Sequence, residues 1–284
     1  MFKLALAQMA HPADGDVIAA ARKWAQRAAN EEAQMLVFPE FMMTPFEKTP
    51  EEYSALAQTL DGEFANAMNS IARETGLWIV YSVNEKNTDS AFDGTSDESS
   101  TSAPQAQQAK PYNTIVVVDN EGNIQGSYHK THLYAAYNTD EHKKVSEGNK
   151  LFTPIKTPFC TLGLGICYDV RFPEHARTAA LNGCDLLIYN FAWFAGPNKV
   201  HHWNTLLCAR AIENEFFIVG CDRPDTNCIG RSTVVDPFGE VIAQAGEGEE
   251  LLFAEIDIEK VENARKAIPC FEHRRPELYS SLVK

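Results

Sequence analysis

Short apolar runs alternate with longer amphipathic stretches along most of the chain. The short runs are rich in aliphatic residues and are bounded by Gly, Pro, Asn or Asp, which is typical of strands. In the longer stretches apolar residues recur every three or four positions, as they do along one face of a helix. Because the two patterns alternate, the sequence predicts an α/β protein. The expected strands cover residues 2–9, 35–38, 77–83, 112–118, 124–129, 161–166, 185–190, 216–221, 232–236, 240–245 and 251–256, and the expected helices cover residues 14–30, 51–76, 173–181 and 203–214.

Two segments depart from this alternation. Residues 87–110 are dense in Ser, Thr, Asp, Gln and Ala and hold little that could enter a core. We expect a flexible surface insertion there, within one domain, because the chain on both sides of it is strand-like. Residues 257–284 predict a helical, partly basic C-terminal tail. The length of 284 residues by itself permits one large domain or two small ones.

The charge of the chain excludes two classes of partner. It has 25 basic and 39 acidic residues and a net charge of −14, and a field of that sign repels nucleic-acid phosphates and anionic lipid. We therefore expect neither nucleic-acid nor membrane binding, and no apolar stretch approaches the roughly 20 residues needed to cross a bilayer. Residues 1–9 resemble the start of a signal peptide, but Gln8 and the acidic residues that follow favour a first buried strand.

The chain has seven cysteines, an odd number that would leave one of them without a disulfide partner, and no two of them form a C-x-x-C pair. We therefore expect no disulfide framework and no zinc ribbon, and the pattern favours a reducing cytoplasm. Cys167 differs from the others because it follows the strand at 161–166 and precedes the helix at 173–181. Such an elbow can present a nucleophile, and the local helix field and backbone N–H groups favour a thiolate. A buried core cysteine is the equal alternative, since no histidine of the chain lies in a recognisable cysteine-protease signature.

Two other predicted strands end on a charge. Glu40 follows the strand at 35–38, and Lys130 follows the strand at 124–129. On general grounds each of them could be a solvated surface charge. If the strands share one sheet edge, however, both charges meet Cys167 beyond the strand ends, where ligand sites of α/β sheets commonly lie.

Three motifs follow one another along the chain: Phe38-Pro39-Glu40, His129-Lys130-Thr131-His132-Leu133 and Gly165-Ile166-Cys167-Tyr168-Asp169-Val170-Arg171-Phe172-Pro173-Glu174. In order and spacing they resemble the three signatures of the nitrilase superfamily of carbon–nitrogen hydrolases. The resemblance runs from Lys3 to about Tyr279, and residues 167–172, 203–214 and 232–240 are most similar to the ω-amidase branch. It implies an αββα sandwich in a single domain, residues 1–284.

The main departure from the family is the insertion at 87–110, where relatives usually have a short loop. That difference bears on substrate selection and oligomer contacts that depend on this loop. It does not bear on the chemistry of the three motifs.

The resemblance also implies a role for each motif residue. Cys167 attacks the carbonyl carbon of an amide, while Glu40 takes the thiol proton and later activates water against the thioester. Lys130 and the backbone N–H of Tyr168 hold the oxyanion. Glu141 aligns with the second glutamate of the family, which positions the lysine and the substrate; the alternative is a solvated charge within a run of charged residues.

An ω-amidase also needs a cation for the far carboxylate of its substrate. Arg171, four residues after the nucleophile, is the natural candidate, and an ion pair with Asp169 or Glu174 is its structural alternative. Trp193 and Phe194 follow a predicted strand and could either wall the pocket or pack in the core.

The histidines do not indicate a cofactor. His129 and His132 could hint at a metal pair, but no third ligand is evident in the sequence. His201 and His202 are expected to be structural or to support other site residues. We expect neither a metal nor another cofactor.

The resemblance implies hydrolysis of a small carboxamide to carboxylate and ammonia through a thioester, with 2-oxoglutaramate or 2-oxosuccinamate as the expected substrate. The alternatives are another carbon–nitrogen hydrolase (aliphatic amidase, carbamoyl hydrolase or nitrilase) and a catalytically silent binding protein on the same fold. The resemblance also implies a homodimer or a larger homo-oligomer. Because a net charge of −14 opposes an anionic substrate, a local cation such as Arg171 must act against the global field.

Overall fold

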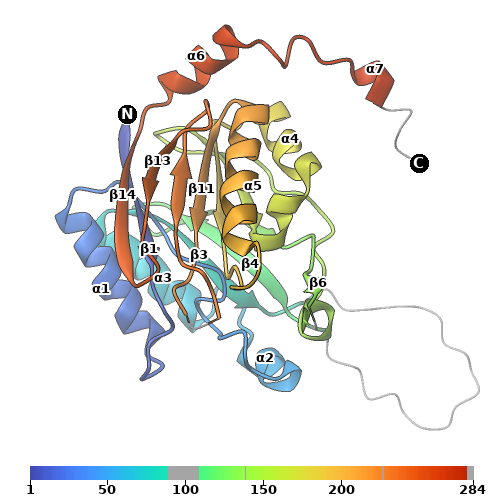
Figure 1. Cartoon of the computed structure of the whole chain (residues 1–284). Coiled ribbons are helices and arrows are strands. Elements are labelled where there is room, and N and C mark those ends of the chain that lie inside the picture. The colour runs from blue at the N-terminus through green and yellow to red at the C-terminus, as the bar shows by residue number, and fades with distance from the viewer. Residues whose placement is uncertain (89–108, 138, 226, 280–284) are drawn as a thin grey trace, which may run out of the picture.

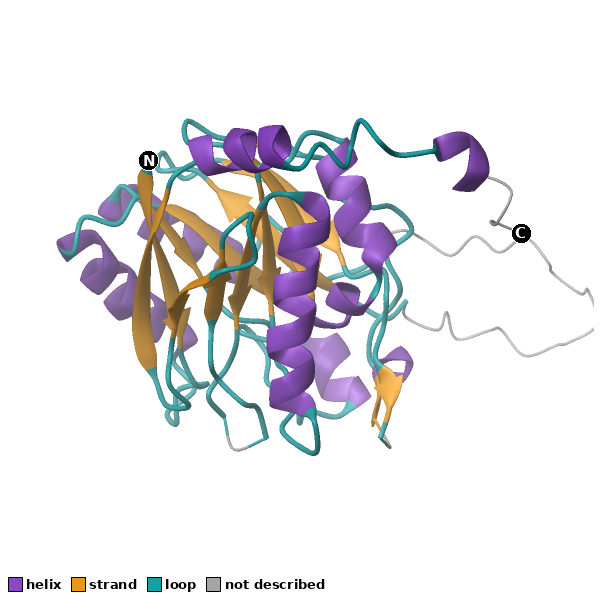
Figure 2. Ribbon diagram, turned by 45° about the horizontal axis from the view of Figure 1, so that its top comes forward, coloured by secondary structure: helices purple, strands orange, loops and turns teal. Residues whose placement is uncertain are grey.

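Two six-stranded sheets face each other, and helices cover the outer face of each (Figures 1 and 2). The computed structural model describes residues 1–88, 109–137, 139–225 and 227–279. Most of the predicted insertion at 87–110 therefore lies outside the described residues, and its flexibility stays a prediction. The αββα sandwich itself, in a single domain, is the architecture that the sequence predicts.

The first sheet is built from the N-terminal half of the chain and its last strand. In spatial order its strands are β14 (Glu250–Ile256), β1 (Phe2–Gln8), β2 (Met35–Val37), β3 (Trp78–Glu85), β4 (Tyr112–Val118) and β5 (Ile124–His129). β2 runs parallel to β1 and β3, whereas β4 and β5 form an antiparallel hairpin. Helices α1 (Val17–Asn30) and α3 (Glu63–Thr75) pack on the outer face of this sheet.

The second sheet follows along the chain and carries the nucleophile candidate. In spatial order its strands are β13 (Val241–Gln244), β12 (Thr233–Val235), β11 (Phe217–Cys221), β10 (Leu186–Asn190), β9 (Thr161–Ile166) and β8 (Ile155–Lys156). β9, β10 and β11 are parallel to one another. Helices α4 (Pro173–Leu181) and α5 (Lys199–Asn214) cover its outer face (Figure 2).

Alternation along the strands divides the apolar residues between two layers. In β1, Leu4 and Leu6 belong to the core between the sheets, whereas Ala5 and Ala7 pack toward the outer helices. Since both faces of the sheet are covered, both sets are buried. The near-continuous apolar runs of the sequence therefore reflect burial on two sides.

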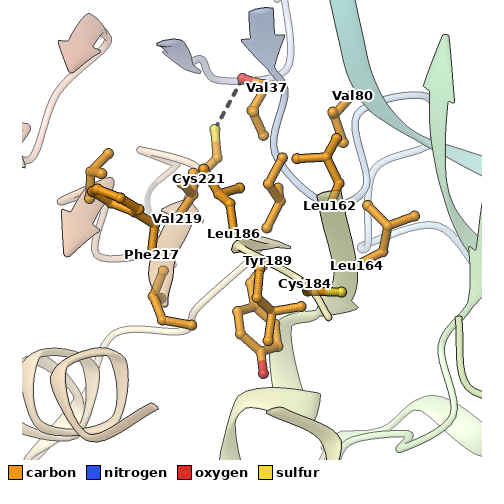
Figure 3. Packing of buried hydrophobic residues seen from close by; sticks show 14 of the residues in the cluster. Val37, Val80, Leu162, Leu164, Cys184, Leu186, Tyr189, Phe217, Val219 and Cys221 are labelled. Carbon is orange, nitrogen blue, oxygen red and sulfur yellow. Dashed lines mark hydrogen bonds between the residues drawn. The ribbon is translucent and has the colours of Figure 1, made fainter. Parts of the chain in front are cut away.

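Figure 3 shows the layer between the sheets. Val37 and Val80 of the first sheet lie opposite Leu162 and Leu164 of the second sheet. The thiol of Cys221 also reaches across, with its Sγ 3.4 Å from the carbonyl oxygen of Val37. The two sheets are thus packed directly against each other, and residues at their ends are held at a fixed separation.

Local signals fix some of the helix ends. The side chain of Asp16 accepts a hydrogen bond from the backbone N–H of Ala19 at 2.9 Å and caps α1. Gly76 ends α3 in a left-handed conformation with φ of 71°, which glycine adopts without strain. The predicted helix over 51–76 is in fact two helices, because α2 (Pro50–Leu56) ends before α3 begins.

Other differences from the sequence prediction are confined to short or terminal segments. α5 begins at Lys199 rather than at Trp203. Strands β6 (Ala135–Ala136), β7 (Thr139–Asp140) and β8 were not predicted, because two residues carry no readable periodicity. The C-terminal tail forms α6 (Glu259–Ala267) and α7 (Pro276–Tyr279), and Figures 1 and 2 place α7 away from the sheets.

In the described part of the chain no helix has the length and apolar character to cross a membrane.

Gly165 in β9 provides a test of this packing. A Cβ at this position would overlap the ring of Tyr189 and lie 2.9 Å from a ring carbon of His175. Both neighbours are buried and have little room to move. We expect Gly165→Ala to lower the free energy of unfolding by about 1–3 kcal/mol, as measured by denaturant unfolding.

Gly248→Ala is the matched control, because a Cβ there meets nothing within 4 Å. We expect its unfolding midpoint to match that of the unsubstituted protein. If both variants were equally stable, the close contact between β9 and β10 would be contradicted.

Candidate active site

Glu40, Lys130 and Cys167 come together where strands of both sheets end. Glu40 follows β2 and Lys130 follows β5 in the first sheet, whereas Cys167 follows β9 in the second. The prediction that these strands share one sheet edge is therefore wrong, because the chain crosses to the other sheet between β5 and β9. Packing of the sheets brings the three side chains together, and they line one cavity whose empty space of about 350 Å³ includes open solvent.

Lys130 lies between two buried carboxylates. Its Nζ is 2.9 Å from Oε1 of Glu40 and 2.8 Å from Oε2 of Glu141. Burial would lower the pKa of Lys130, but Glu141 and then Glu40 outweigh it and hold that pKa well above the ordinary value. Lys130 is therefore an ammonium. Since an ammonium has three donors and two serve the carboxylates, one N–H remains for a substrate.

Glu141 is buried, at 3% exposure, and is not the solvated charge that its sequence context allowed. It lies in a short 3₁₀ helix, Glu141–Lys143, directly after β7. The backbone N–H of Tyr134 donates to its Oε2 at 2.5 Å. Burial raises the pKa of Glu141, Lys130 opposes that rise, and Glu40 adds to it. The ionised form of Glu141 is therefore stabilised by the Lys130 ammonium.

Glu40 is fully buried and is held by donors from both sheets. Its Oε1 accepts a hydrogen bond from Nδ2 of Asn113 in β4 at 2.8 Å, besides the bond from Lys130. Its Oε2 accepts one from the backbone N–H of Ala192, which follows β10, at 2.9 Å. These bonds fix the orientation of the carboxylate beside the cavity. The sequence analysis assigned no role to Asn113.

Cys167 forms the elbow that the sequence predicts. β9 ends at Ile166, and Cys167 has a left-handed backbone with φ of 44° at the start of a short 3₁₀ helix, Cys167–Arg171. Asp169 stabilises this turn, because its Oδ2 accepts the backbone N–H of Ile166 at 2.8 Å. A residue with a Cβ is strained at such a φ, and here the strained residue carries the thiol.

The resting form of Cys167 differs from the sequence expectation. Burial and then the charge of Glu40 raise the pKa of the Cys167 thiol well above its ordinary value, and Lys130 lowers it by less. The expectation that the elbow favours a thiolate is therefore wrong for the free protein. The thiol keeps its proton until a base removes it, and Glu40 is a carboxylate that lines the same cavity.

Aromatic rings form the walls of the cavity. The predicted residues Tyr168 and Trp193 both line it, together with Tyr134 and Phe194. The Tyr168 ring packs edge-on against Tyr134, with ring centroids 5.1 Å apart. Trp193 is fixed by two bonds, from its backbone N–H to Asp222 at 2.8 Å and from its indole N–H to the carbonyl of Lys199 at 3.0 Å. The pocket-wall prediction for Trp193 and Phe194 thus agrees with their location.

Arg171 lies behind one of these walls. Its guanidinium stacks on the Trp193 ring at 4.8 Å from the centroid, and its Nη2 is 3.4 Å from Nδ1 of His202. Within the described residues neither Asp169 nor Glu174 forms an ion pair with it, and Arg171 does not line the cavity. Its binding of a substrate carboxylate stays a prediction.

Lys199 is the charged residue of the cavity lining that sequence reasoning missed. It is the first residue of α5, it is buried, and it lines the cavity with Cys167 and Trp193. A signal was present, since Lys199 is the one charged residue in the apolar stretch 190–200. The sequence prediction started this helix at residue 203, which left Lys199 in a loop, whereas α5 in fact begins at Lys199.

The histidines have separate partners. His129 pairs with Glu85 at 2.9 Å, and His132 pairs with Asp169 at 2.7 Å. Among the residues that the structure describes, no group of three or more His, Cys, Asp or Glu side chains is placed to hold a metal ion. His201 is exposed, while His202 lies beside Arg171.

Replacement of Lys130 tests the buried charge arrangement. We expect Lys130→Met to lower the free energy of unfolding by about 3–5 kcal/mol, because it leaves two buried carboxylates facing each other. The pKa of Glu141 is raised in the folded protein even though Lys130 opposes the rise. A carboxyl with a raised pKa in the folded state destabilises that state as pH rises, and loss of Lys130 enlarges this effect. Urea unfolding should therefore show a larger loss at pH 8 than at pH 5.

The control is Lys48→Met, which breaks a solvent-exposed pair with Glu52. We expect this variant to lose less than about 1 kcal/mol at either pH. Equal losses in the two variants would show that burial of the Lys130 ammonium has no special energetic role.

Comparison with known proteins places the whole chain in one family. Residues 3–266 match the family model described as carbon-nitrogen hydrolase. Over 296 aligned residues the chain is 31% identical to the protein named omega-amidase NIT2 of Homo sapiens. The alignment covers 100% of this chain and 98% of the human protein. It is 30% identical to deaminated glutathione amidase of Escherichia coli O157:H7 over 249 residues, covering 88% of this chain and 87% of that protein.

Solved structures show the same fold. The Caenorhabditis elegans NitFhit protein superposes with a TM-score of 0.84 at 31% identity, covering 98% of this chain and 66% of that longer chain. Saccharomyces cerevisiae Nit3, described as a member of branch 10 of the nitrilase superfamily, has a TM-score of 0.79 at 27% identity and covers 94% of each chain. On the sequence match and the shared fold, this chain belongs to the carbon–nitrogen hydrolase family, within the nitrilase superfamily.

Proposed function

We propose that this chain is an ω-amidase that hydrolyses a small carboxamide, 2-oxoglutaramate or 2-oxosuccinamate, to a carboxylate and ammonia. The observation that carries the proposal is the buried arrangement of Glu40, Lys130 and Cys167 around one cavity. Similarity to proteins named omega-amidase from Homo sapiens and Xenopus laevis supports the substrate class.

In the first half of the reaction the Cys167 sulfur attacks the amide carbonyl carbon. The raised pKa of Cys167 means that its proton must leave during attack, and Glu40 accepts it. The oxyanion that forms is held by the remaining Lys130 N–H and by the backbone N–H of Tyr168. Collapse of this intermediate breaks the C–N bond, the Glu40 proton passes to the nitrogen, and ammonia leaves a thioester on Cys167.

The second half repeats the same steps with water. Glu40, again a carboxylate, takes a proton from a water molecule that attacks the thioester carbon. The C–S bond then breaks, the sulfur recovers its proton, and the carboxylic acid product leaves. Glu141 does not exchange protons in this scheme; it holds the Lys130 ammonium toward the reacting carbon.

The size of the cavity supports a small substrate. Its empty space of about 350 Å³ already includes open solvent, so the enclosed part of the cavity is narrow. Aromatic rings form its walls, which favours a short amide over a bulky one.

A second candidate function follows from a wider outer cavity. It continues from the inner one along Phe46, Tyr134, Phe194 and Lys199, and it has a volume of about 1,480 Å³, including open solvent. An amide with a longer tail could extend into this space. Relatives named deaminated glutathione amidase fit this second reading.

Ammonia release by the Cys167→Ala variant tests the mechanism. We expect the unsubstituted protein to release ammonia from 2-oxoglutaramate and 2-oxosuccinamate. The variant should lose at least about a thousandfold in kcat, because it has no nucleophile, while its thermal midpoint stays close to that of the parent.

Cys208→Ala is the matched control, since Cys208 lies on α5 and does not line the cavity. The substrate panel also includes deaminated glutathione, neutral aliphatic amides, carbamoyl compounds and nitriles, which separate the alternative branches. Turnover by Cys167→Ala would rule out the thioester route, and an inert panel would favour a binding protein.

We also propose a homo-oligomer formed through the face that α4 and α5 present. Leu181, Ile212 and Phe238 are 47–54% exposed on this side of the second sheet, and Gly239 packs against the Ile212 side chain. Neighbouring exposed apolar side chains of this kind are typical of protein contacts.

A cytoplasmic location is proposed as well, because the reaction needs Cys167 as a free thiol, and the seven cysteines are unpaired.

Ile212→Glu tests the oligomer face. A buried, unpaired charge would oppose association, so we expect sedimentation velocity to show a shift toward monomer. Leu56→Glu on α2 is the control, because Leu56 is 44% exposed on a different part of the surface. If Ile212→Glu sediments like the parent, this face is not the interface.

A further inference from the structure

Lys199 is a buried cation at the junction of the two cavities. It begins α5, its exposure is 7%, and it lines both the inner cavity that holds Cys167 and the wider outer one. A lysine in the first turn opposes the helix dipole, which favours negative charge there. Helix formation therefore does not explain its presence.

The surroundings of the Lys199 ammonium are aromatic rather than acidic. Its Nζ lies 5.2 Å from the ring centroids of Tyr134, Tyr137 and Trp193, and it donates to the Tyr134 hydroxyl at 3.3 Å. In the part of the chain that the structure describes, no carboxylate forms an ion pair with it. Lys130, in the same cavity, has two such partners. A buried ammonium that has only rings and one hydroxyl around it lacks a counter-charge.

A second cation adds to the positive potential at this point. Arg171 and Lys199 both stack on Trp193, at 4.8 and 5.2 Å from the ring centroid. Arg171 is also without an ion-pair partner among the described residues. Burial and then Arg171 lower the pKa of Lys199, so a bound anion would stabilise the Lys199 ammonium. The indole thus has two cations beside it, and Lys199 is the one that faces the cavity.

We infer that Lys199 binds the carboxylate of the substrate and selects ω-amides of short acids over neutral amides. The inference rests on the proposed function, since it places the amide group at Cys167 and the acid group at the other end of the inner cavity. Cys167 and Lys199 line the same inner cavity, and Lys199 also lines the outer one, so an amide at Cys167 can direct its acid end toward Lys199. Arg171 strengthens the same positive potential from behind Trp193 without lining the cavity.

Kinetics of Lys199→Met with two substrates tests this assignment. Pentanamide matches 2-oxoglutaramate in carbon chain length and has no carboxylate. For 2-oxoglutaramate we expect kcat/KM to fall by about 10- to 100-fold, mostly through KM, as for loss of a hydrogen bond to a charged group. For pentanamide we expect less than about a threefold change, because Met fills the same space between the rings. An unchanged ratio of the two kcat/KM values would overturn the inference.

Two further variants keep the test decisive. Lys199→Gln retains a polar side chain and is used if the Met variant loses its thermal transition; the same fall in the ratio is expected. Lys23→Met, on the exposed side of α1, is the control for loss of one positive charge and should leave both substrates unaffected.

A binding measurement separates this inference from the proposed function. If the unsubstituted protein hydrolyses no amide, the proposed function fails, and calorimetry with 2-oxoglutarate then decides the role of Lys199. Cys167→Ala should bind 2-oxoglutarate at least about tenfold more tightly than the Cys167→Ala, Lys199→Met double variant. Equal affinities, or no binding by either protein, would overturn the Lys199 assignment.

Discussion

The active site depends on one buried ammonium held between two carboxylates. Removing Lys130, Glu40 and Glu141 from water is unfavourable unless each charge finds a partner, and the structure provides partners from several elements. Asn113 of the first sheet and the backbone N–H of Ala192 from the second both donate to Glu40. The charge group is therefore complete only after the sheets have packed, so its geometry is a product of the whole sandwich.

In this arrangement the permanent charge and the reactive group belong to different residues, Lys130 and Cys167. Because the Lys130 pKa is raised, the ammonium persists across the physiological range, whereas burial keeps the Cys167 proton in place until attack. The reactive sulfur is thus protected in the free protein and becomes nucleophilic only as Glu40 takes its proton. Lys199 extends the same electrostatic logic outward, since it offers positive charge where the inner cavity meets the wider one.

The hydrophobic pattern was sufficient for the fold class, but the three motif residues were singled out by the resemblance to the nitrilase superfamily. Their places at strand ends alone left each of them open to a structural or surface role. The sequence did not show that the three residues meet between two sheets. Which sheet a strand joins depends on pairing between strands that are far apart in the sequence. Lys199 was missed for a related reason. The helix that carries it starts earlier than its apolar pattern, and a lone lysine gains meaning only from the rings of Tyr134 and Trp193 around it.

The left-handed backbone of Cys167 links reactivity to a cost in folding stability. At a φ of 44° a side chain with a Cβ costs roughly 1–2 kcal/mol that glycine would not. Replacement by glycine would relieve this strain but would also remove the thiol. The nucleophile is therefore held in a conformation that the rest of the fold must stabilise. The folding stability that offsets this strain comes from other parts of the chain. Both faces of each sheet are covered, and the apolar residues buried there contribute that stability.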